Sequence, residues 1–575
     1  MKRPHDTRTD TGAGPAGGAS APGARPAAHA APHAGRTADE RVPVLIVGGS
    51  LVGLSASLFL GRLGVPHLLV ERHSGTSHHP RGRGNNVRTM ELLRTAGVEP
   101  AIHEAASVLA GNHGILQAAS LTGDDQRWLF RKIDPTGAVS RISPAGWCLC
   151  SQNDLEPVLL RAARDLGGDL RFGIRMASFE QDADGVTAVL ADRATGECRT
   201  VRADYLIAAD GPRGFVREQL GIGQTGRGEL FHNVSITFRA KRLAEIVGDR
   251  RFIACYLTDP EHGGALLPVD NQEQWVFHAP WHPEHGETLE DFTDERCVKH
   301  IRGATGVPDL EVEISDRAPW HAAERVAERY GRGRVWLAGD SAHEMSPTGA
   351  FGSNTGIQDA HNLAWKIAAV LDGWAGPDLL ETYGAERQPV AVATSARAAS
   401  RSAEHSHPGY AAPPTEGRQS DVMAVALGYR YPAGAVVGTD PAAPPVPERF
   451  EATGAPGTRA PHLWVTRGGE RVSLLDLYER AMVLLAGPAG AAWQAAGRQA
   501  ATRLGVPMEC HRVGPDPDAD LVTEPGADWT RAYGTGPAGA VLVRPDGFVA
   551  WRSAGAAADP EGTLTDVLRS VLRRR

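Results

Sequence analysis

The sequence predicts an α/β protein in which a nucleotide-binding domain is interrupted by a mainly antiparallel sheet and followed by a second α/β domain. Three observations predict this class. A buried strand, a glycine-rich turn and a helix begin the apolar part of the chain at residues 44–63. Strands of alternating polarity, separated by Gly and Pro, dominate residues 171–320. Strands and helices alternate again after residue 461.

The opening unit is a βαβ motif built around Gly48 and Gly53. Four aliphatic residues, 44–47, suit a strand that is covered on both faces. The next strand ends at Glu71, 23 positions after Gly48, where a dinucleotide fold places the carboxylate that binds ribose hydroxyls. Ser50 occupies the middle glycine position, and a helix N-terminus there still offers free N–H groups to an anion. A glycine turn of this kind also occurs for purely structural reasons.

Two further apolar strands end at a carboxylate. One stops at Asp210-Gly211, and the other runs into Gly339-Asp340. A loop over residues 341–356 follows the second strand, and its glycine content argues against regular structure. Beyond this loop we expect an amphipathic helix that begins near Thr355.

Within the sheet region, the strand at residues 232–238 separates two kinds of side chain. One face carries Val234, Ile236 and Phe238, and the other carries Asn233, Ser235 and Thr237. The polar face either roofs a pocket or faces solvent, and both interpretations stay open at this point.

Composition narrows the functional classes. The 575 residues are enough for two or three domains, and a net charge of -8 argues against a nucleic-acid partner. No apolar run reaches the ~18 residues of a membrane span. Six scattered cysteines give neither a disulfide framework nor a metal-ligand spacing, so we expect no metal site. Residues 1–40 lack large apolar side chains and a signal peptide, and we expect a disordered tail on a cytoplasmic protein.

Taken in order, the three strand-terminal signals resemble those of the single-component FAD-dependent aromatic hydroxylases, the group that includes phenol and p-hydroxybenzoate hydroxylases. The finer resemblance is to members that tailor polycyclic aromatic polyketides, and within them to the tetracenomycin A2 oxygenase type. It covers nearly the whole chain after residue 41 and rests on Gly49–Gly53, Pro80-Arg81, Asn86, Arg88–Glu91, Ser151-Gln152, Leu155-Glu156, Ser341–Pro347, Asn354, Asp359, Glu386-Arg387 and Gly428–Tyr431. The sequence departs from the family pattern at Ser50, Gly214, Ala350 and Ser353.

This resemblance implies a FAD-binding Rossmann-like domain, an antiparallel-sheet substrate domain, non-covalent FAD, and NADPH or NADH as co-substrate. The residues that it assigns to the cofactor are Gly48, Gly49, Ser50, Gly53, Glu71, Arg72, Arg81, Gln152, Asp210, Gly211, Gly339, Asp340, Pro347, Gly349, Gly352, Ser353 and Asn354. The helix after the glycine loop would then point its positive N-terminal end at the flavin.

The implied reaction is hydroxylation of a polycyclic aromatic polyketide of the tetracenomycin or anthracycline kind, in antibiotic biosynthesis. NADPH would reduce the flavin, and O2 would add at flavin C4a to give the hydroxylating species. Arg81, His343 and Pro347 are the candidate catalytic residues, although a surface or core-capping role is the alternative for His343. Three aromatic residues of the sheet region are expected to contact the substrate: Tyr256, Trp275 and Phe277.

Two other functions fit the same motifs. A Baeyer-Villiger oxygenase would use the same cofactor on a similar polyketide, and a non-catalytic FAD-binding protein would keep the fold without turnover. A flavin halogenase is disfavoured because W-x-W-x-I-P is missing. Whether the chain forms a homo-oligomer is left open.

The domain boundaries follow from these motifs. We expect the FAD domain at 41–170 and 321–404 with one strand near 203–220, the substrate sheet at 171–320, a connector at 405–460 and a last domain at 461–575. The order of elements in the last domain, with a hairpin turning at Pro545-Asp546-Gly547, resembles a thioredoxin fold. It lacks C-x-x-C, and its only cysteine is Cys510.

Overall fold

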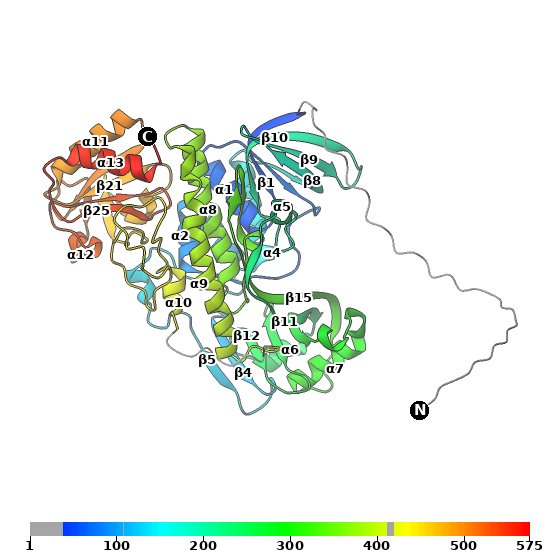
Figure 1. The fold of residues 1–575 in the computed structure, drawn as a ribbon. Coiled ribbons are helices and arrows are strands. Elements are labelled where there is room, and N and C mark those ends of the chain that lie inside the picture. The colour runs from blue at the N-terminus through cyan, green and yellow to red at the C-terminus, as the bar shows by residue number, and fades with distance from the viewer. Residues whose placement is uncertain (1–37, 107, 411–418) are drawn as a thin grey trace, which may run out of the picture. The chain divides into compact units, whose positions relative to one another are not determined.

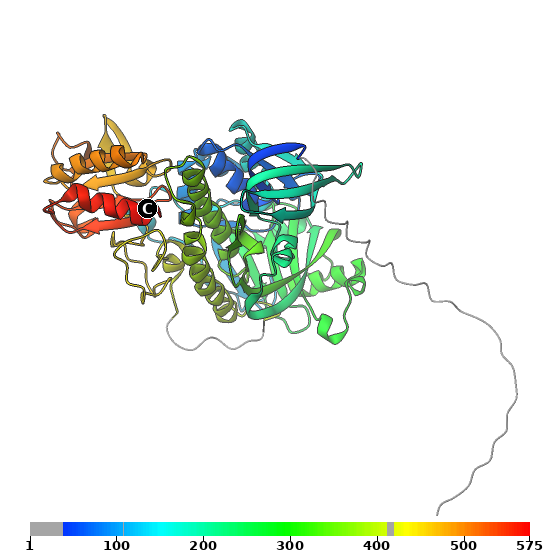
Figure 2. The same ribbon diagram turned by 45° about the horizontal axis from the view of Figure 1, so that its top comes forward.

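The structure is a computed structural model, and it describes residues 38–106, 108–410 and 419–575. The expected disordered tail at 1–40 lies almost entirely outside the described residues. The described chain contains three large sheets (Figures 1 and 2).

The first sheet carries the predicted nucleotide-binding motif. Its strands are, in spatial order, β16 (Gly331–Arg332), β17 (Val335–Leu337), β10 (Cys198–Ala208), β1 (Glu40–Val47), β2 (His67–Glu71) and β7 (Asp169–Phe172). β1 runs parallel to both β2 and β10, and β10 runs parallel to β17. The predicted strand ends therefore meet at one edge of the sheet, where open α/β sheets bind ligands.

Helices α1 (Leu51–Arg62), α4 (Gln152–Asp165) and α8 (Phe351–Leu371) pack beside this sheet. Their apolar side chains and the four aliphatic residues of β1 belong to one buried core. The strand at 44–47 is buried, as its unbroken aliphatic run predicts.

The boundaries of the sheet region differ from the prediction. β8 (Ile174–Gln181) and β9 (Val186–Asp192) were expected in the substrate sheet, yet they pair next to β10 in the first sheet. The reason is the length of β10: its second half pairs with β17, and β9 covers the edge that its first half leaves open.

The second sheet is the expected, mainly antiparallel one. Its strands are, in spatial order, β18 (His343–Glu344), β15 (Glu313–Ala327), β11 (Gln224–Arg239), β14 (Gln274–Trp281), β13 (Gly264–Pro268), β12 (Phe252–Leu257), β4 (Gly114–Ala118) and β5 (Arg127–Phe130). β4 and β5 come from the segment that the sequence assigned to the FAD domain. Alternation of polarity identifies a strand but does not name its partner, which tertiary packing decides.

The two faces of β11 have separate environments. Val234, Ile236 and Phe238 are fully buried in a core that also includes side chains of α6 (Arg242–Val247) and α7 (Asp294–Thr305). Asn233 and Ser235, on the other face, are also buried, at 0% and 1% exposure. The polar face of this strand therefore does not point to solvent, which removes one of the two interpretations.

The third sheet forms the C-terminal domain. Its strands are, in spatial order, β20 (Glu470–Ser473), β19 (Trp464–Arg467), β23 (Leu521–Thr523), β22 (Met508–Gly514), β21 (Met482–Ala486), β24 (Ala540–Val543) and β25 (Val549–Ser553). Helices α11 (Ala491–Leu504) and α13 (Pro560–Val571) pack on each other and contribute to one core with β21 and β24. The alternation of strands and helices predicted after residue 461 occurs, and so does the hairpin at residues 545–547 between β24 and β25.

The segment between helix α9 (Thr382–Glu404) and this domain is more than a linker. It contains α10 (Val422–Ala426), and its Tyr429 and Tyr431 are buried in one cluster with Phe548 of the last hairpin and Phe351 of α8. The C-terminal domain is thereby joined by apolar contacts to the helix that follows the glycine-rich loop.

Candidate functional site

The first glycine turn is shaped by close backbone approaches. Gly48 has φ +107°, and a Cβ there would lie 2.1 Å from the carbonyl oxygen of Ala209. A Cβ on Gly53 would lie 1.8 Å from the Gly48 carbonyl oxygen. Only glycine fits at both positions, so β1, α1 and the end of β10 come as close as the sequence motif predicts.

A chain of hydrogen bonds surrounds this turn. Glu71 accepts from the backbone N–H of Gly49 at 2.6 Å. The Ser50 hydroxyl donates to Glu156 at 2.6 Å and accepts from the Gln152 amide at 2.9 Å. Ser50, which replaces the usual glycine, is thus a member of a polar network at the N-terminus of α1, and Glu156 is a further member that the sequence-based assignment did not include.

The second strand-terminal carboxylate, Asp210, caps a short helix. It accepts from the N–H of Val216 in α5 (Phe215–Gln219) at 3.0 Å, while its other oxygen has no partner among the residues described. Burial raises the pKa of this carboxyl. A Cβ on Gly214 would lie 2.9 Å from the unpartnered oxygen. Glycine at this position therefore avoids a steric clash with that oxygen. Gly211, next to Asp210, has φ +86° and meets no atom within 4 Å of a built Cβ.

The third carboxylate, Asp340, follows β17 and Gly339. Its side chain is accessible to solvent although it lies deep among protein atoms, and this environment raises the pKa of its carboxyl. Such a combination is typical of a group that lines an open cavity. Gly339 has φ +63°, and its Cα lies 2.9 Å from where a Cβ on Gly356 would be, so α8 packs against this turn.

Helix α8 begins at Phe351, four residues before the predicted start near Thr355. The predicted loop at 341–356 therefore ends early, and Gly352, Ser353 and Asn354 form the first helical turn. The residue before the helix is Ala350, with φ +54° and no side-chain acceptor, so the N-cap residue does not cap the first N–H groups of α8. A backbone this strained in a non-glycine residue is typical of functional sites.

Asn354 ties the start of α8 to the loop before α2 (Val87–Thr95). Its amide donates to the carbonyl of Gly84 at 2.8 Å, and its side-chain oxygen accepts from the N–H of Asn86 at 2.9 Å. Pro347 and Gly349 lie in the turn just before the helix, where Ala350 N–H donates to the Pro347 carbonyl at 3.0 Å. Pro347 is exposed.

Two arginines assigned to the cofactor have exposed side chains. The carbonyl of Arg81 accepts from the N–H of Gln152 at 3.0 Å, which places Arg81 beside the Ser50 network. Arg72 follows Glu71, and its carbonyl accepts from Arg193 at 2.9 Å. Both guanidinium groups are exposed, so an anion that binds here could reach them.

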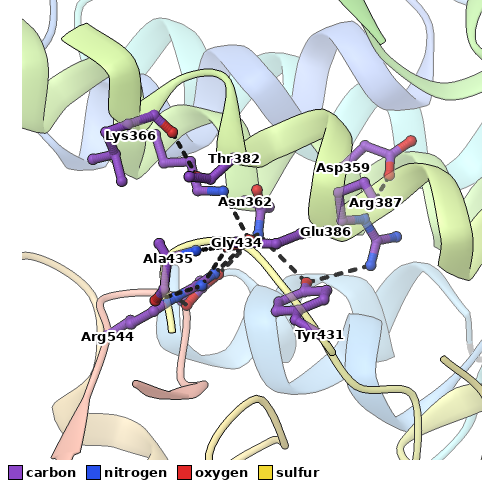
Figure 3. Close-up of polar contacts among 12 residues, drawn as sticks. Asp359, Asn362, Lys366, Thr382, Glu386, Arg387, Tyr431, Gly434, Ala435 and Arg544 are labelled. Atoms are coloured by element: carbon purple, nitrogen blue, oxygen red, sulfur yellow. Dashed lines mark hydrogen bonds and ion pairs between the residues drawn. The ribbon is translucent and has the colours of Figure 1, made fainter. Parts of the chain in front are cut away.

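His343, one of the candidate catalytic residues, does not face this region. It is fully buried, and its Nε2 lies 2.8 Å from Asp359 of α8. Asp359 in turn accepts from Arg387 at 2.7 Å, and Arg387 lies between Asp359 and Tyr431 (Figure 3). Burial would raise the pKa of the Asp359 carboxyl, but Arg387 and His343 lower it. The core-capping alternative for His343 fits this position.

The polar face of the second sheet is covered by the segment that carries Arg81. The register places Asn233, Ser235 and Thr237 of β11, His278 of β14, Trp320 of β15 and Tyr256 of β12 on this one face. His79 meets Ser235 at 3.0 Å, and Arg83 donates to the carbonyl of Pro268. The loop that begins at the cofactor residues therefore lies directly on the sheet.

Of the three aromatic residues expected at the substrate, the structure brings only Tyr256 to this face. Trp275 and Phe277 alternate with His278 along β14, so they point the other way, into the core against α6 and α7. This corrects the prediction for these two residues. The sequence analysis did not predict Trp320 and His278. The alternation along the strands would identify them if the polar face, rather than the apolar one, were taken as the face of the site.

A cavity of about 600 Å³ adjoins the polar face and is lined in part by Pro280, Pro408 and Gly409. A Cβ on Gly409 would lie 3.8 Å from the Asn233 amide nitrogen. The residues that line the cavity include neither the glycine turn nor the start of α8, so it lies beside the second sheet.

The residues present fit a dinucleotide with a flavin ring. They combine a glycine turn open to phosphate, a carboxylate at the ribose position and an uncapped helix N-terminus beside an accessible Asp340. Among the described residues, one group could offer metal ligands, the exposed His282, Glu284 and His285 after β14, and nothing at it indicates an ion. All six cysteines are free. In the described part of the chain, none of the helices has both the length and the hydropathy that crossing a bilayer requires.

Comparison with known proteins agrees with this reading. Residues 41–398 match the family described as FAD binding domain, and residues 453–574 match the aromatic-ring hydroxylase C-terminal domain. A Streptomyces halstedii protein that is provisionally named a polyketide hydroxylase is 67% identical over 93% of this chain and 97% of its own. The tetracenomycin A2 monooxygenase-dioxygenase of Streptomyces glaucescens is 44% identical over 93% of this chain and 97% of its own.

A solved structure, aklavinone-11 hydroxylase with FAD and aklavinone, superimposes with a TM-score of 0.85 and 42% identity, over 94% of this chain and 100% of that one. The family models and these relatives span both the cofactor side and the sheet side of the site described above. The chain belongs to the FAD-dependent aromatic-ring monooxygenases.

Proposed function

We propose that this protein hydroxylates a polycyclic aromatic polyketide, using FAD, NADPH or NADH, and O2. The proposal rests on one observation: a single loop contacts both the first turn of α8 and the polar face of the second sheet. The loop at residues 79–86 is bonded to the first turn of α8 through Asn354 and lies on the buried polar face of the second sheet through His79 and Arg83. A flavin at α8 and an aromatic substrate on the sheet would therefore be neighbours.

When bound, FAD supplies hydride acceptance and O2 activation. The chain would supply binding and charge control. Gly48, Gly53 and the N–H groups of α1 would receive the pyrophosphate, and Glu71 the adenosine ribose. The uncapped N-terminus of α8 would favour negative charge on the flavin by about 0.3–1 kcal/mol, and by more where the contact is buried.

The chemistry of the substrate side supports an aromatic polyketide. Tyr256, Trp320 and His278 offer ring surfaces, and Asn233 and Ser235 offer hydrogen bonds on the same face. The relatives with the matching whole-chain architecture carry the names polyketide hydroxylase, tetracenomycin A2 monooxygenase-dioxygenase and aklavinone 12-hydroxylase. A planar, oxygen-rich ring system is the ligand that such a surface suits.

The source of the inserted oxygen tests this function. The purified holoenzyme is incubated with NADPH and a panel of hydroxylated naphthacenequinones under 18O2. We expect one labelled oxygen in each new hydroxyl group, located by mass spectrometry and NMR. Label that arrives only from H2(18)O, without later exchange, would contradict the proposal.

The two alternatives separate in the same experiment. Insertion of the labelled oxygen between two ring carbons, rather than at a C–H position, would indicate a Baeyer-Villiger oxygenase. No oxidation of NADPH under air with any member of the panel would favour a non-catalytic FAD-binding protein. Comparing NADPH with NADH would fix the co-substrate.

We further propose that the C-terminal domain is thioredoxin-like in fold and inactive in disulfide exchange. That reaction needs two thiols, and Cys510 is the only cysteine after residue 461. Six free cysteines also suit a cytoplasmic protein. The contacts of the C-terminal domain with α2, α8 and α9 support a role in bracing the FAD-binding part of the chain.

A further inference from the structure

Arg83 is a buried cation on the substrate side of the site. Its side chain lies between the loop before α2 and the second sheet, and the residue is 7% exposed. One guanidinium nitrogen, Nη1, donates to the carbonyl of Pro268 at the end of β13. The other terminal nitrogen, Nη2, is buried and has no partner among the described residues.

The surroundings of Arg83 contain little negative charge. No carboxylate of the described residues forms an ion pair with it, and the attractive charge that acts on it comes from the more distant Asp154. Burial lowers the pKa of Arg83 to about 10, so the guanidinium is still charged at neutral pH. A buried charge without a counter-ion is strongly destabilising. In this protein the unpaired buried charge lies where the substrate is expected to bind.

The histidines at this face are neutral at neutral pH. Burial lowers the pKa of His278 well below its usual value and that of His407 to about 4, and the charge of Arg83 adds to the effect on His278. The pKa of His79 is lowered as well, mainly by burial and by Arg81. Arg83 is therefore a cation at this face with a buried donor that has no partner among the described residues, and Arg401, which acts on Tyr256, is a second one.

His278 adds a second donor. Its Nδ1 accepts from the indole N–H of Trp320 at 3.3 Å, which leaves the proton of the neutral ring on Nε2. Further along the face, both side-chain polar atoms of Asn233 and the hydroxyl of Thr237 are buried and have no hydrogen-bond partner in the described part of the chain. Buried polar atoms in native proteins are normally satisfied, so a cluster of unsatisfied ones marks a place for ligand oxygens.

We infer that Arg83 binds an ionised hydroxyl oxygen, a phenolate or enolate, of the polycyclic substrate. The inference rests on the proposed function and assigns the ionisation state in which the substrate is held. The hydroxyl proton passes to solvent on binding, and no bond to carbon changes. The negative oxygen enriches the ring in electrons, which is what attack by an electrophilic oxygen donor requires. Asn233 then hydrogen-bonds a second oxygen of the same ligand.

A purely structural role is the competing explanation, in which Arg83 only fastens the loop to β13 through Pro268. The two roles differ in one measurable property. A fastening residue affects stability and FAD content, whereas a residue that binds an anion also changes the pH at which the bound ligand ionises.

The experiment uses the FAD-loaded full chain and alizarin, a 1,2-dihydroxyanthraquinone whose colour changes when a hydroxyl ionises. Absorbance titrations from pH 5 to 9 give the pKa of the free and the bound dye. We expect the wild type to lower the dye's pKa by one unit or more. Arg83→Met should lose this shift and weaken binding of the ionised dye at least ten-fold, while Arg83→Lys should keep part of it. The other titratable or charged groups that face the site are Tyr256, His79, His278, His405, His407, Arg81, Arg401, Asp154 and Asp316.

Arg239→Met is the matched control, because it removes a surface cation from β11 in the same sheet, where Arg239 pairs with Glu273. It should leave the pKa of the bound dye unchanged. An unshifted dye on the wild type would overturn the inference without any variant, and so would a full shift retained by a well-folded Arg83→Met protein. Failure of the proposed function would differ: neither alizarin nor any naphthacenequinone would bind in either ionisation state.

Discussion

Glu386 of α9 and Arg544 of the C-terminal domain form a fully buried, two-pronged ion pair, with nitrogen–oxygen distances of 2.7 and 2.8 Å. Lys366 of α8 donates to the same carboxylate at 2.7 Å, and Asn362 donates to it at 2.8 Å (Figure 3). Side chains from α8, α9 and the C-terminal domain therefore meet at one carboxylate, and Glu386 directly precedes Arg387 of the Asp359–Arg387 pair.

This relationship predicts a large loss of stability for Arg544→Met. The change leaves the Glu386 carboxylate with Lys366 alone among cations, and breaking a buried pair costs about 3–5 kcal/mol. Denaturant unfolding of the holoenzyme measures it. Arg467→Met is the control, because Arg467 and Glu509 form an exposed pair at 3.0 Å on the third sheet, where a loss below about 1 kcal/mol is expected. Equal losses in the two variants would show that the buried pair adds nothing.

The same carboxylate predicts an acid-sensitive component of stability. Burial would raise the pKa of Glu386, but Arg544 and Lys366 lower it to about 2, from 4.5. The folded state thus binds the proton less readily than the unfolded state, so the stabilisation is complete above pH 4.5 and is lost as the pH falls toward 2. Unfolding free energies measured across this range should fall less steeply for Glu386→Gln than for the wild type. Parallel slopes would contradict the assignment.

The glycine turn predicts strict size limits at Gly53. Gly53→Ala places a Cβ 1.8 Å from the Gly48 carbonyl oxygen, so the turn must open and the FAD content of the purified protein should drop. Gly75→Ala is the matched control, since its Cβ would meet no atom within 4 Å. Flavin absorbance relative to protein absorbance measures both. A Gly53→Ala protein that is as yellow as the control would refute the placement of the pyrophosphate.

Asp340 is expected to contact the cofactor rather than to support the fold, because its side chain is accessible and forms no ion pair within the described residues. Asp340→Ala should therefore lower FAD occupancy while the apoprotein unfolds at an unchanged temperature. Undiminished FAD in a folded Asp340→Ala protein would remove this residue from the site. A drop in apoprotein stability alone would assign it to the fold.

Cys510 is expected to be inert. It is 7% exposed, burial raises the pKa of its thiol to about 11, and Gly497 packs directly against its sulfur. A neutral, enclosed thiol does not exchange disulfides. Cys510→Ser should leave the turnover rate nearly unchanged. A ten-fold loss in a stable variant, about 1.4 kcal/mol of barrier, would instead tie this domain to catalysis.

The sequence by itself determined the elements whose causes are local. The turn at Gly48 and Gly53, the carboxylates after β2, β10 and β17, and the elements after residue 461 follow from glycine sterics, unbroken aliphatic runs and short-range periodicity. The structure contains the glycine turn, the three carboxylates at the strand ends and the alternating strands and helices after residue 461.

Only the tertiary structure decided which partners these elements find. Alternation shows that Trp275 and Phe277 share a face, but the choice of the face that meets the cofactor loop depends on α6 and α7, which bury the apolar one. In the sequence, His343 lies in the same expected loop as the cofactor residues. In the structure it is buried in the core, where it contacts Asp359 of α8. In the sequence, nothing distinguishes Arg83 from the other arginines of its loop. Only the structure shows that it is buried against the second sheet. In each case the deciding interaction joins residues distant in the chain, and pairing of that kind leaves no local pattern.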